Sequence, residues 1–258
     1  MVLLKNKWLA EIVVKCIQFQ NQLIKKKGAN KMKIWHFSDS HMLHNRILVP
    51  DGIEMAIFSG DCSNPRDKYS NEQEVFNFIE WYGSLKIPYK IMIAGNHDTS
   101  IEAKFVTREK IESKGIIYLE NESKEVGGFK IYGSPFTPTF GEWAFMKARD
   151  KLHNLWQTIP FNSDIVIIHG PPKGILDLSY NRMNVLEFCG CNALKNRMLE
   201  IQPKLMCFGH IHNHKDIINA GWTKLNKYQT IFSNGSCVTD GKFEYGPTSH
   251  GNVFDLTI

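Results

Sequence analysis

The sequence predicts an α/β domain in which helices cover a mainly buried sheet. From Lys33 onward, short apolar runs rich in β-branched residues alternate with stretches whose apolar residues recur at helical spacing. The 258 residues are 43% hydrophobic and 22% charged, which is typical of a globular protein long enough to bury a complete core. Residue types that bind metals follow five of the apolar runs, a placement typical of sites at the carboxyl ends of strands.

Five apolar runs are predicted to be buried strands, because each is short and almost continuous in apolar residues. They cover residues 33–37, 54–58, 89–94, 164–168 and 204–208. Later runs are expected to be partly antiparallel strands. These cover residues 127–132, 215–219, 230–232 and 252–256.

Three stretches are predicted to be helices. Residues 71–86 place Val75, Ile79 and Tyr82 on one apolar face. Residues 141–158 and 191–202 are also expected to be helical. Pro203 ends the last of them, because proline cannot continue a helix.

A basic amphipathic helical extension is expected at residues 1–31, ahead of a domain formed by residues 32–258. Trp8, Ile12 and Phe19 recur at helical spacing, and Lys-Lys-Lys-Gly at residues 25–28 is a typical helix end. Three roles stay open for this extension. It could pack on the domain or on a partner, as in a dimer, attach to a membrane surface, or be a leader ahead of a start at Met32.

The net charge of +5 is concentrated in this extension. Residues 1–31 hold seven lysines and one acidic residue, so the rest of the chain carries a net charge of −1. A nearly neutral domain lacks a basic footprint, so no stable nucleic-acid partner is expected. No apolar run reaches the roughly 18 residues that cross a bilayer. The six cysteines form no CxxC pair, which indicates reduced thiols and a cytoplasmic protein.

Each of the five predicted core strands is followed by candidate metal ligands. The junctions hold Asp39, His41, Asp61, Asn96, His97, Asp98, His169, His210 and His212. Because the carboxyl ends of neighbouring parallel strands meet at one edge, we expect these side chains to share one crevice. Glycines at positions 60, 95, 170 and 209 suit the sharp turns that this requires.

The donor set contains carboxylates, an amide and imidazoles but no thiolate. It therefore suits Mn²⁺, Fe or Zn²⁺ better than Mg²⁺ or Cu⁺. There are too many ligands for one ion and enough for two ions that share a carboxylate. Two ions about 3.5–4 Å apart can generate hydroxide at neutral pH and clamp a phosphoryl group during displacement.

The ordered motifs DxH, GD, GNHD, H and GHxH, from Asp39 to His212, resemble those of the calcineurin-like metallophosphoesterase superfamily. The resemblance implies a four-layer α/β/β/α sandwich of two mixed sheets flanked by helices. It implies two divalent transition metal ions, with Mn²⁺ expected before Fe, Zn, Ni or Co, and a metal-bridging hydroxide as nucleophile. Asp39, His41 and His212 would bind one ion, Asn96, His169 and His210 the other, and Asp61 would bridge them.

The resemblance also implies catalytic roles for His97 and Asp98. His97 would contact the phosphate and protonate the leaving oxygen, for which an imidazole has a suitable pKa. Asp98 would orient His97. Asn96 would contact substrate as well, and His44 and Arg46, which follow the first motif, are further candidates for binding the phosphate or a base. The alternative for His44 and Arg46 is a solvated loop.

Three shorter stretches, residues 133–136, 143–145 and 169–172, are similar to the small metallophosphoesterase-domain-containing branch of the superfamily. That similarity implies hydrolysis of nucleotides, either cyclic phosphodiesters or nucleoside monophosphates. The alternatives are a protein Ser/Thr phosphatase, whose Asp-Arg-Gly motif is absent here, a DNA nuclease, and a weakly active metal-binding scaffold. Phe136, Phe140 and Trp143 are assigned to core packing rather than to stacking on a base.

Overall fold

Two β-sheets, each with helices on its outer face, make up most of the protein. The computed structural model describes residues 31–64, 67–181, 183–240 and 245–258. The chain divides into two units, Met1–Met32 with Asp255–Ile258, and Lys33–Phe254, and the site discussed below lies in the second. The helical extension expected at residues 1–31 lies outside the described residues except for Lys31.

The first sheet contains five strands in the order β15-β1-β2-β3-β4. Their bounds are β1 Lys31–Phe37, β2 Met55–Phe58, β3 Tyr89–Met92, β4 Ile117–Tyr118 and β15 Asn252–Thr257. Strands β1 to β4 pair in parallel, with Ile34 opposite Met55 and Met55 opposite Tyr89. Their carboxyl ends therefore lie at the same edge of the sheet.

Helices α2 (Lys68–Ser84), α3 (Thr99–Glu102) and α4 (Arg108–Glu112), with a short 3-10 helix η1 (His44–Arg46), belong to this half. The apolar face of α2 is buried against the sheet, because Phe78, Ile79 and Tyr82 share one core cluster with Phe37 and Phe58. Asp67 caps α2 by accepting a hydrogen bond from the amide of Ser70 at 2.9 Å. Helix α2 corresponds to the helix predicted at residues 71–86, and it begins and ends slightly earlier in the chain.

The second sheet contains six strands in the order β13-β14-β12-β9-β6-β5. Their bounds are β5 Glu122–Val126, β6 Phe129–Ser134, β9 Ile165–Ile168, β12 Leu205–Phe208, β13 Gly221–Lys224 and β14 Ile231–Asn234. The four central strands are parallel, and β5 and β13 pair antiparallel at the two edges. Helices α5 (Arg149–Gln157) and α6 (Asn192–Ile201) bury Trp156 and Met198 against this sheet.

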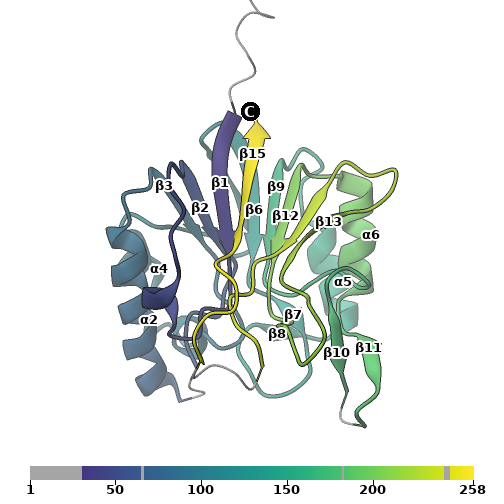
Figure 1. The fold of residues 1–258 in the computed structure, drawn as a ribbon, viewed down its shortest axis with the longest axis horizontal. Helices are drawn as coiled ribbons and strands as arrows, with labels where there is room; N and C mark the ends of the chain where they lie inside the picture. Colours follow the sequence, from purple (N-terminus) through teal and green to yellow (C-terminus); the bar gives the residue numbers. More distant parts are fainter. Residues whose placement is uncertain (1–30, 65–66, 182, 241–244) are drawn as a thin grey trace, which may run out of the picture. The chain divides into compact units, whose positions relative to one another are not determined.

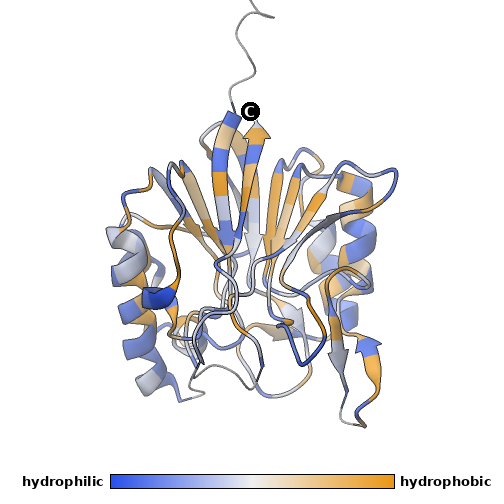
Figure 2. Ribbon diagram, viewed as in Figure 1, coloured by the Kyte–Doolittle hydropathy of each residue, from blue (hydrophilic) through white to orange (hydrophobic). Residues whose placement is uncertain are grey.

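The two sheets pack face to face. Nδ1 of His36 on β1 lies 2.7 Å from Oγ of Ser233 on β14, and a Cβ at Gly133 on β6 would lie 2.9 Å from Cγ2 of Ile93. Helices α2 and α4 lie outside the first sheet and α5 and α6 outside the second (Figure 1). Apolar residues, drawn in orange, predominate in the central strands, whereas polar residues, drawn in blue, are frequent on the helices (Figure 2). The predicted four-layer α/β/β/α sandwich is therefore confirmed.

Some predicted elements are wrong. The helix expected at residues 141–158 begins only at Arg149, because Met146–Lys147 forms strand β8 and pairs with β7 (Thr137–Pro138). Residues 215–219 are not a strand, and β13 begins at Gly221 instead. The sequence also missed strands β4, β5, β7, β8, β10 (Leu178–Tyr180) and β11 (Leu186–Phe188). Within the described residues, no helix has both the length and the apolar character that crossing a bilayer requires.

Candidate metal centre and its cleft

The predicted metal ligands lie together at the carboxyl ends of the parallel strands. Asp39 and His41 follow β1, Asp61 follows β2, Asn96 follows β3, His169 follows β9, and His210 and His212 follow β12. Donor atoms of Asp39, His41 and His212 lie within 4.8 Å of one another, as do those of Asp61, His169 and His210. The two groups are joined by a third set of the same size, formed by His41, Asp61 and His97.

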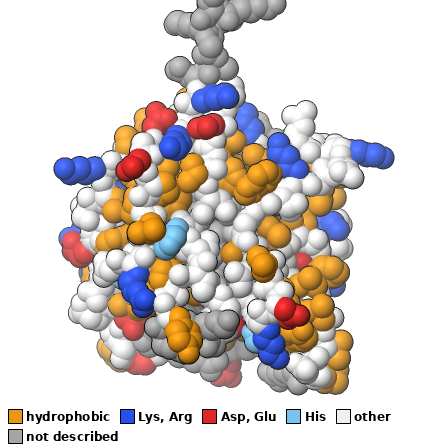
Figure 3. Space-filling model, viewed as in Figure 1, with side chains coloured by type: hydrophobic (Ala, Val, Ile, Leu, Met, Phe, Trp, Pro, Cys, Tyr) orange, Lys and Arg blue, Asp and Glu red, His pale blue; other side chains and the backbone are white. Residues whose placement is uncertain are grey.

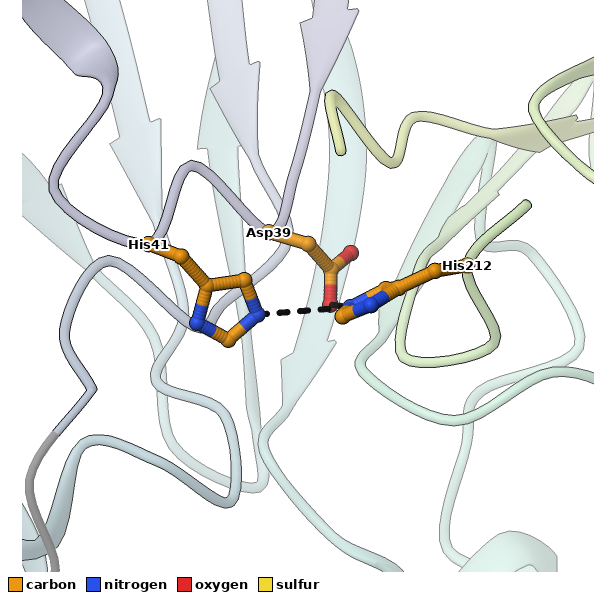
Figure 4. Close-up of side chains that lie close together, drawn as sticks. All are labelled: Asp39, His41 and His212. Carbon is orange, nitrogen blue, oxygen red and sulfur yellow. Dashed lines mark hydrogen bonds and ion pairs between the residues drawn. The ribbon is translucent and has the colours of Figure 1, made fainter. Parts of the chain in front are cut away.

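The first group is formed by Asp39, His41 and His212 (Figure 4). Nε2 of His212 lies 3.1 Å from Oδ1 of Asp39 and 3.3 Å from Nε2 of His41. Nδ1 of His41 lies 3.1 Å from the carbonyl oxygen of Ser63, and Nδ1 of His212 lies 2.6 Å from Oδ1 of Asp240. These oxygens accept from Nδ1, so Nε2 of each ring points into the group, and that of His212 lies beside the carboxylate of Asp39.

The second group is formed around His169. Its Nε2 lies 3.2 Å from Oδ2 of Asp61 and 2.8 Å from Oδ1 of Asn96, while its Nδ1 lies 2.8 Å from the carbonyl oxygen of Ser59. The ring centroids of His210 and His169 lie 5.0 Å apart. The other oxygen of Asp61 accepts a hydrogen bond from the amide of His97 at 2.7 Å.

Several of these residues have backbone conformations that L-amino acids rarely adopt. Asp39, His41, Asp61 and His210 have φ angles of 49°, 41°, 62° and 67°. Such a conformation costs about 1–3 kcal/mol per residue and is common at functional sites. At Gly60, φ is 101°, and a Cβ would lie 2.7 Å from Nδ1 of His169, so a side chain there would displace a candidate ligand.

Burial would raise the pKa of the Asp61 carboxyl, but His169 and His97 hold this pKa well below its usual value. Burial likewise opposes ionisation of Asp39, and the hydrogen bond from His212 lowers its pKa. Burial alone would lower the pKa of His169, yet Asp61 raises it to about 9. The pKa of His212 rises to about 10 against burial, because Asp240 and Asp39 accept from its ring.

The other two histidines of these groups are held neutral. Burial lowers the pKa of His41 to about 4 and that of His210 to about 3, and the neighbouring His212 and His169 add to this effect. Neutral imidazoles have a lone pair for a cation, and the buried carboxylates require positive charge beside them. The donor set of carboxylate, imidazole and amide oxygen therefore fits divalent transition metals.

Asp98, which was expected to orient His97, contacts two neighbouring loops in the structure. Its carboxylate accepts hydrogen bonds from the amide of Gly95 at 2.8 Å, the amide of Asp61 at 3.0 Å and Oγ of Ser63 at 2.8 Å. It thereby ties the loop after β2 to the loop after β3. The His97 ring is oriented differently, with Nδ1 3.1 Å from the carbonyl oxygen of Asn64. The motif position of Asp98 gives no information about these amides, because those of Asp61 and Ser63 lie on another loop.

His44 and Arg46, which were expected to contact substrate, make other contacts in the structure. The His44 side chain is buried, with its ring 5.5 Å from that of Phe78 and 5.3 Å from that of Trp81. Nη2 of Arg46 donates to the carbonyl oxygen of Tyr245 at 3.0 Å. Neither residue lines the cleft, because η1 turns them toward α2 and toward the C-terminal part of the chain.

A cleft of about 780 Å³ opens beside the two groups. Asp61, Asn96, His97 and His210 line it together with aromatic residues. The ring centroids of Trp143 and His97 lie 4.2 Å apart, and those of Phe140 and His210 lie 5.2 Å apart. Phe140 and Trp143 are therefore cleft residues and not core residues, whereas Phe136 packs against the core as expected.

Asp240 is a cleft residue that the sequence did not indicate. It accepts from Nδ1 of His212 and lies 28 positions beyond it, outside every recognised motif. A carboxylate behind a metal-binding histidine fixes the ring orientation and increases its basicity. The only signal in the sequence is an Asp–Gly pair, which is more typical of a turn.

Comparison with known proteins gives a consistent result. The family model described as calcineurin-like phosphoesterase matches residues 32–214. Metallophosphoesterase domain-containing protein 1 of Homo sapiens is 33% identical over 243 residues, covering 85% of this chain and 69% of that protein. A UPF0046 protein of Caenorhabditis elegans is 32% identical over 248 residues, covering 89% and 82%. The solved phosphopantetheinyl hydrolase PptH of Mycobacterium tuberculosis shares the fold, with a TM-score of 0.52 at 12% identity over 89% and 97% of the two chains.

Proposed function

The chain belongs to the calcineurin-like phosphoesterase family and is a phosphoesterase, and from this premise we propose that it hydrolyses small phosphoesters, nucleotides above all, with two divalent metal ions. Its similarity to metallophosphoesterase domain-containing protein 1 and to UPF0046 proteins confirms the branch expected from the sequence. The observation that carries the proposal is the pair of donor groups beside the cleft, which the set of His41, Asp61 and His97 links.

The proposed ligands divide as the groups do. Asp39, His41 and His212 would hold one ion, Asn96, His169 and His210 the other, and Asp61 would touch both. When bound, the ions supply Lewis acidity, which activates water as a nucleophile and neutralises charge on the phosphoryl group. We expect Mn²⁺ first, with Fe, Zn, Ni or Co as alternatives, because the donors are oxygen and imidazole nitrogen.

His97 is the proposed proton donor to the leaving oxygen. A carbonyl oxygen can only accept, so Nδ1 of His97 donates to Asn64 and Nε2 remains for the substrate. Because the ring of His97 is already oriented, no substrate-binding energy is needed to orient it. Proton donation by a positioned histidine accelerates such reactions by about 10²–10⁴-fold.

The aromatic residues of the cleft support a nucleotide as substrate. Phe140 and Trp143 offer ring faces to a nucleobase within a few ångströms of His210 and His97. A long nucleic acid has less support. On the face shown in Figure 3, lysine and arginine side chains are spread among acidic and apolar residues and form no continuous basic track.

Metal-dependent turnover tests the proposal. The full chain would be stripped with a chelator, reloaded with Mn²⁺, Fe²⁺, Zn²⁺, Ni²⁺ or Co²⁺, and assayed on cyclic nucleotides, 5′-nucleotides, a phosphopeptide and DNA. We expect about two metal equivalents per chain and preferential hydrolysis of nucleotides. Preference for the phosphopeptide or for DNA would contradict the substrate class, and no turnover with any metal would contradict the enzyme.

A variant pair separates metal binding from proton donation. His97→Ala should retain its metal but slow turnover by about 10²–10⁴-fold. Asp61→Asn should lower metal occupancy and turnover together, and the exposed His153→Ala serves as control. If His97→Ala loses the metal, His97 is a ligand and not the proton donor.

A further inference from the structure

The cleft continues past the candidate metal ligands to two cationic side chains. Arg149, the first residue of α5, and Lys173, in the loop after β9, line it together with Tyr180 and Cys189. These residues do not come from the loops that hold Asp39, Asp61 or His97. The same cleft therefore contains a second polar region that the proposed hydrolysis does not use.

Arg149 and Lys173 flank the same short backbone segment, residues 189–191. Arg149 donates from Nη1 to the carbonyl oxygen of Gly190 at 3.0 Å and from Nη2 to that of Cys189 at 3.2 Å. The amide of Lys173 donates to the carbonyl oxygen of Cys191 at 3.1 Å. Lys173 therefore meets this segment through its backbone and Arg149 through its side chain, and both residues line the same cleft.

Neither cation is neutralised by an ion pair. Among the residues with described positions, Arg149 bonds to carbonyl oxygens only, and Nζ of Lys173 has no hydrogen-bond or carboxylate partner. Glu187 also lines the cleft, and its carboxylate accepts from Nδ2 of Asn181 at 3.4 Å. Asp177 is a second acid beside the same segment, so two acids and two bases meet here, and among the described residues neither acid forms an ion pair with Arg149 or Lys173.

The segment that holds the cations is tightly fitted. A Cβ at Gly190 would lie 2.7 Å from the carbonyl oxygen of Pro171 and 2.8 Å from Oδ2 of Asp177. The same oxygen of Asp177 accepts from the amides of Gly174 at 3.0 Å and Gly190 at 2.8 Å. The loop that follows His169 is thus tied to residues 189–191, and the carbonyl oxygens of this segment hold the guanidinium of Arg149.

We propose that Arg149 and Lys173 form a second anion subsite, which selects phosphoesters that carry an additional phosphate. The ester phosphate would lie at the Asp61 groups, a planar base beside Phe140 and Trp143, and the second phosphate at the two cations. This inference rests on the proposed function and narrows its substrate class to bisphosphorylated nucleotides and similar dianions. A guanidinium suits phosphate because it donates two parallel hydrogen bonds to its oxygens.

Binding of two matched nucleotides tests the subsite directly. Isothermal titration of the Mn²⁺-loaded full chain would compare thymidine 5′-monophosphate with thymidine 3′,5′-bisphosphate. We expect the bisphosphate to bind about tenfold more tightly, as charge-assisted hydrogen bonds to one extra phosphate would give. The variant Arg149→Gln with Lys173→Gln should abolish this preference by lowering the affinity for the bisphosphate far more than the affinity for the monophosphate.

Two further variants check whether the preference depends on these two side chains in particular. Lys151→Gln removes a positive charge from the same helix α5 outside the cleft and should keep the full preference. Lys173→Gln alone removes a side chain that holds no other part of the structure and should reduce the preference about threefold. Equal affinities for the two nucleotides, or equal weakening of both in the variants, would overturn the subsite.

Turnover is measured separately, on p-nitrophenyl esters of thymidine 5′-phosphate with and without a 3′-phosphate. Faster turnover of the bisphosphate at low concentration would support the subsite. If neither ester is hydrolysed but the bisphosphate still binds selectively, the proposed hydrolysis fails and the anion subsite stands. If both esters are hydrolysed with equal kcat/KM, the hydrolysis stands and the subsite fails.

Discussion

Four of the five imidazoles in the candidate centre are oriented by an oxygen behind them. Nδ1 of His41, His97 and His169 faces a backbone carbonyl, and Nδ1 of His212 faces the carboxylate of Asp240. Nε2 of each ring is therefore the nitrogen left for a metal or a substrate. Sequence motifs cannot show this, because three of the four acceptors are carbonyl oxygens, which every residue has.

Asp240 provides a test of this orientation. Asp240→Asn should weaken metal binding by about 10–100-fold, because His212 loses the negative charge that fixes its ring and increases its basicity. Competition with a fluorescent chelator measures the metal affinity. Asp216→Asn, at an exposed position of the same region, should bind metal as the unmodified chain does. Unchanged affinity in Asp240→Asn would contradict the positioning role.

His44 predicts a pH dependence of stability. Burial lowers its pKa from 6.5 to about 4. Between these values the unfolded chain takes up a proton that the folded chain does not, so stability falls as the pH falls from about 6.5 to about 4. Replacing the imidazole with a phenyl ring of similar shape removes this effect.

His44→Phe should therefore raise Tm more at pH 5 than at pH 8, measured by circular dichroism. Both ring nitrogens of His44 lack a hydrogen-bond partner among the described residues, so their loss leaves no donor or acceptor unpaired. The exposed His153→Gln should show no such difference. A tenfold loss of kcat/KM in His44→Phe would instead support contact between His44 and substrate, which the structure argues against.

At the scale of elements, the continuous buried strands of the core were predictable, and several short or exposed strands were not. Strands β2, β9 and β12 begin one residue later than predicted and end where predicted, because continuous apolar runs are buried on both faces. Strand β5 has four exposed residues in a row, so it shows no apolar pattern. Strands β10 and β11 are short and pair only with each other, and their sequences resemble loops.

Tyr82 joins α2 to the first sheet. Its hydroxyl lies 2.8 Å from the carbonyl oxygen of Ala56 on β2 and 3.1 Å from that of Ile91 on β3, and the side chain is buried. Tyr82→Phe leaves these contacts without their donor and should reduce the free energy of unfolding by about 1–2 kcal/mol. Urea unfolding measures this loss. Tyr89→Phe, on a half-exposed ring of β3, is the control, and equal stability of the two variants would contradict the link.

At the scale of the whole molecule, the candidate centre joins the two sheets. The first sheet provides Asp39, His41, Asp61 and Asn96, and the second provides His169, His210 and His212. The site between the two sheets exists only in the folded state. The binding free energy of a cation there therefore adds to the stability of the fold. The roles of residues 1–31, the domain boundary at residue 32 and the cytoplasmic location stay predictions.

Metal removal should therefore destabilise the entire fold. With Mn²⁺ at about 100 times its Kd, the gain in stability is about 2.7 kcal/mol. For a chain of this size that corresponds to a rise in Tm of about 5–10 °C, measured by differential scanning calorimetry with and without chelator. Asp61→Asn should show a smaller rise. Identical Tm values of the unmodified chain with and without Mn²⁺ would contradict a metal site between the sheets.

The sequence by itself determined the α/β class, the phosphoesterase family and the strand ends that carry the candidate ligands. These follow from local apolar runs and from short motifs directly after them. Only the tertiary structure decided that His44 belongs to the core, that Asp98 binds amides and that Asp240 lies behind His212. It also placed Arg149 and Lys173 in the cleft. These contacts join loops far apart in the chain, and their geometry depends on how the two sheets pack, which no local pattern records.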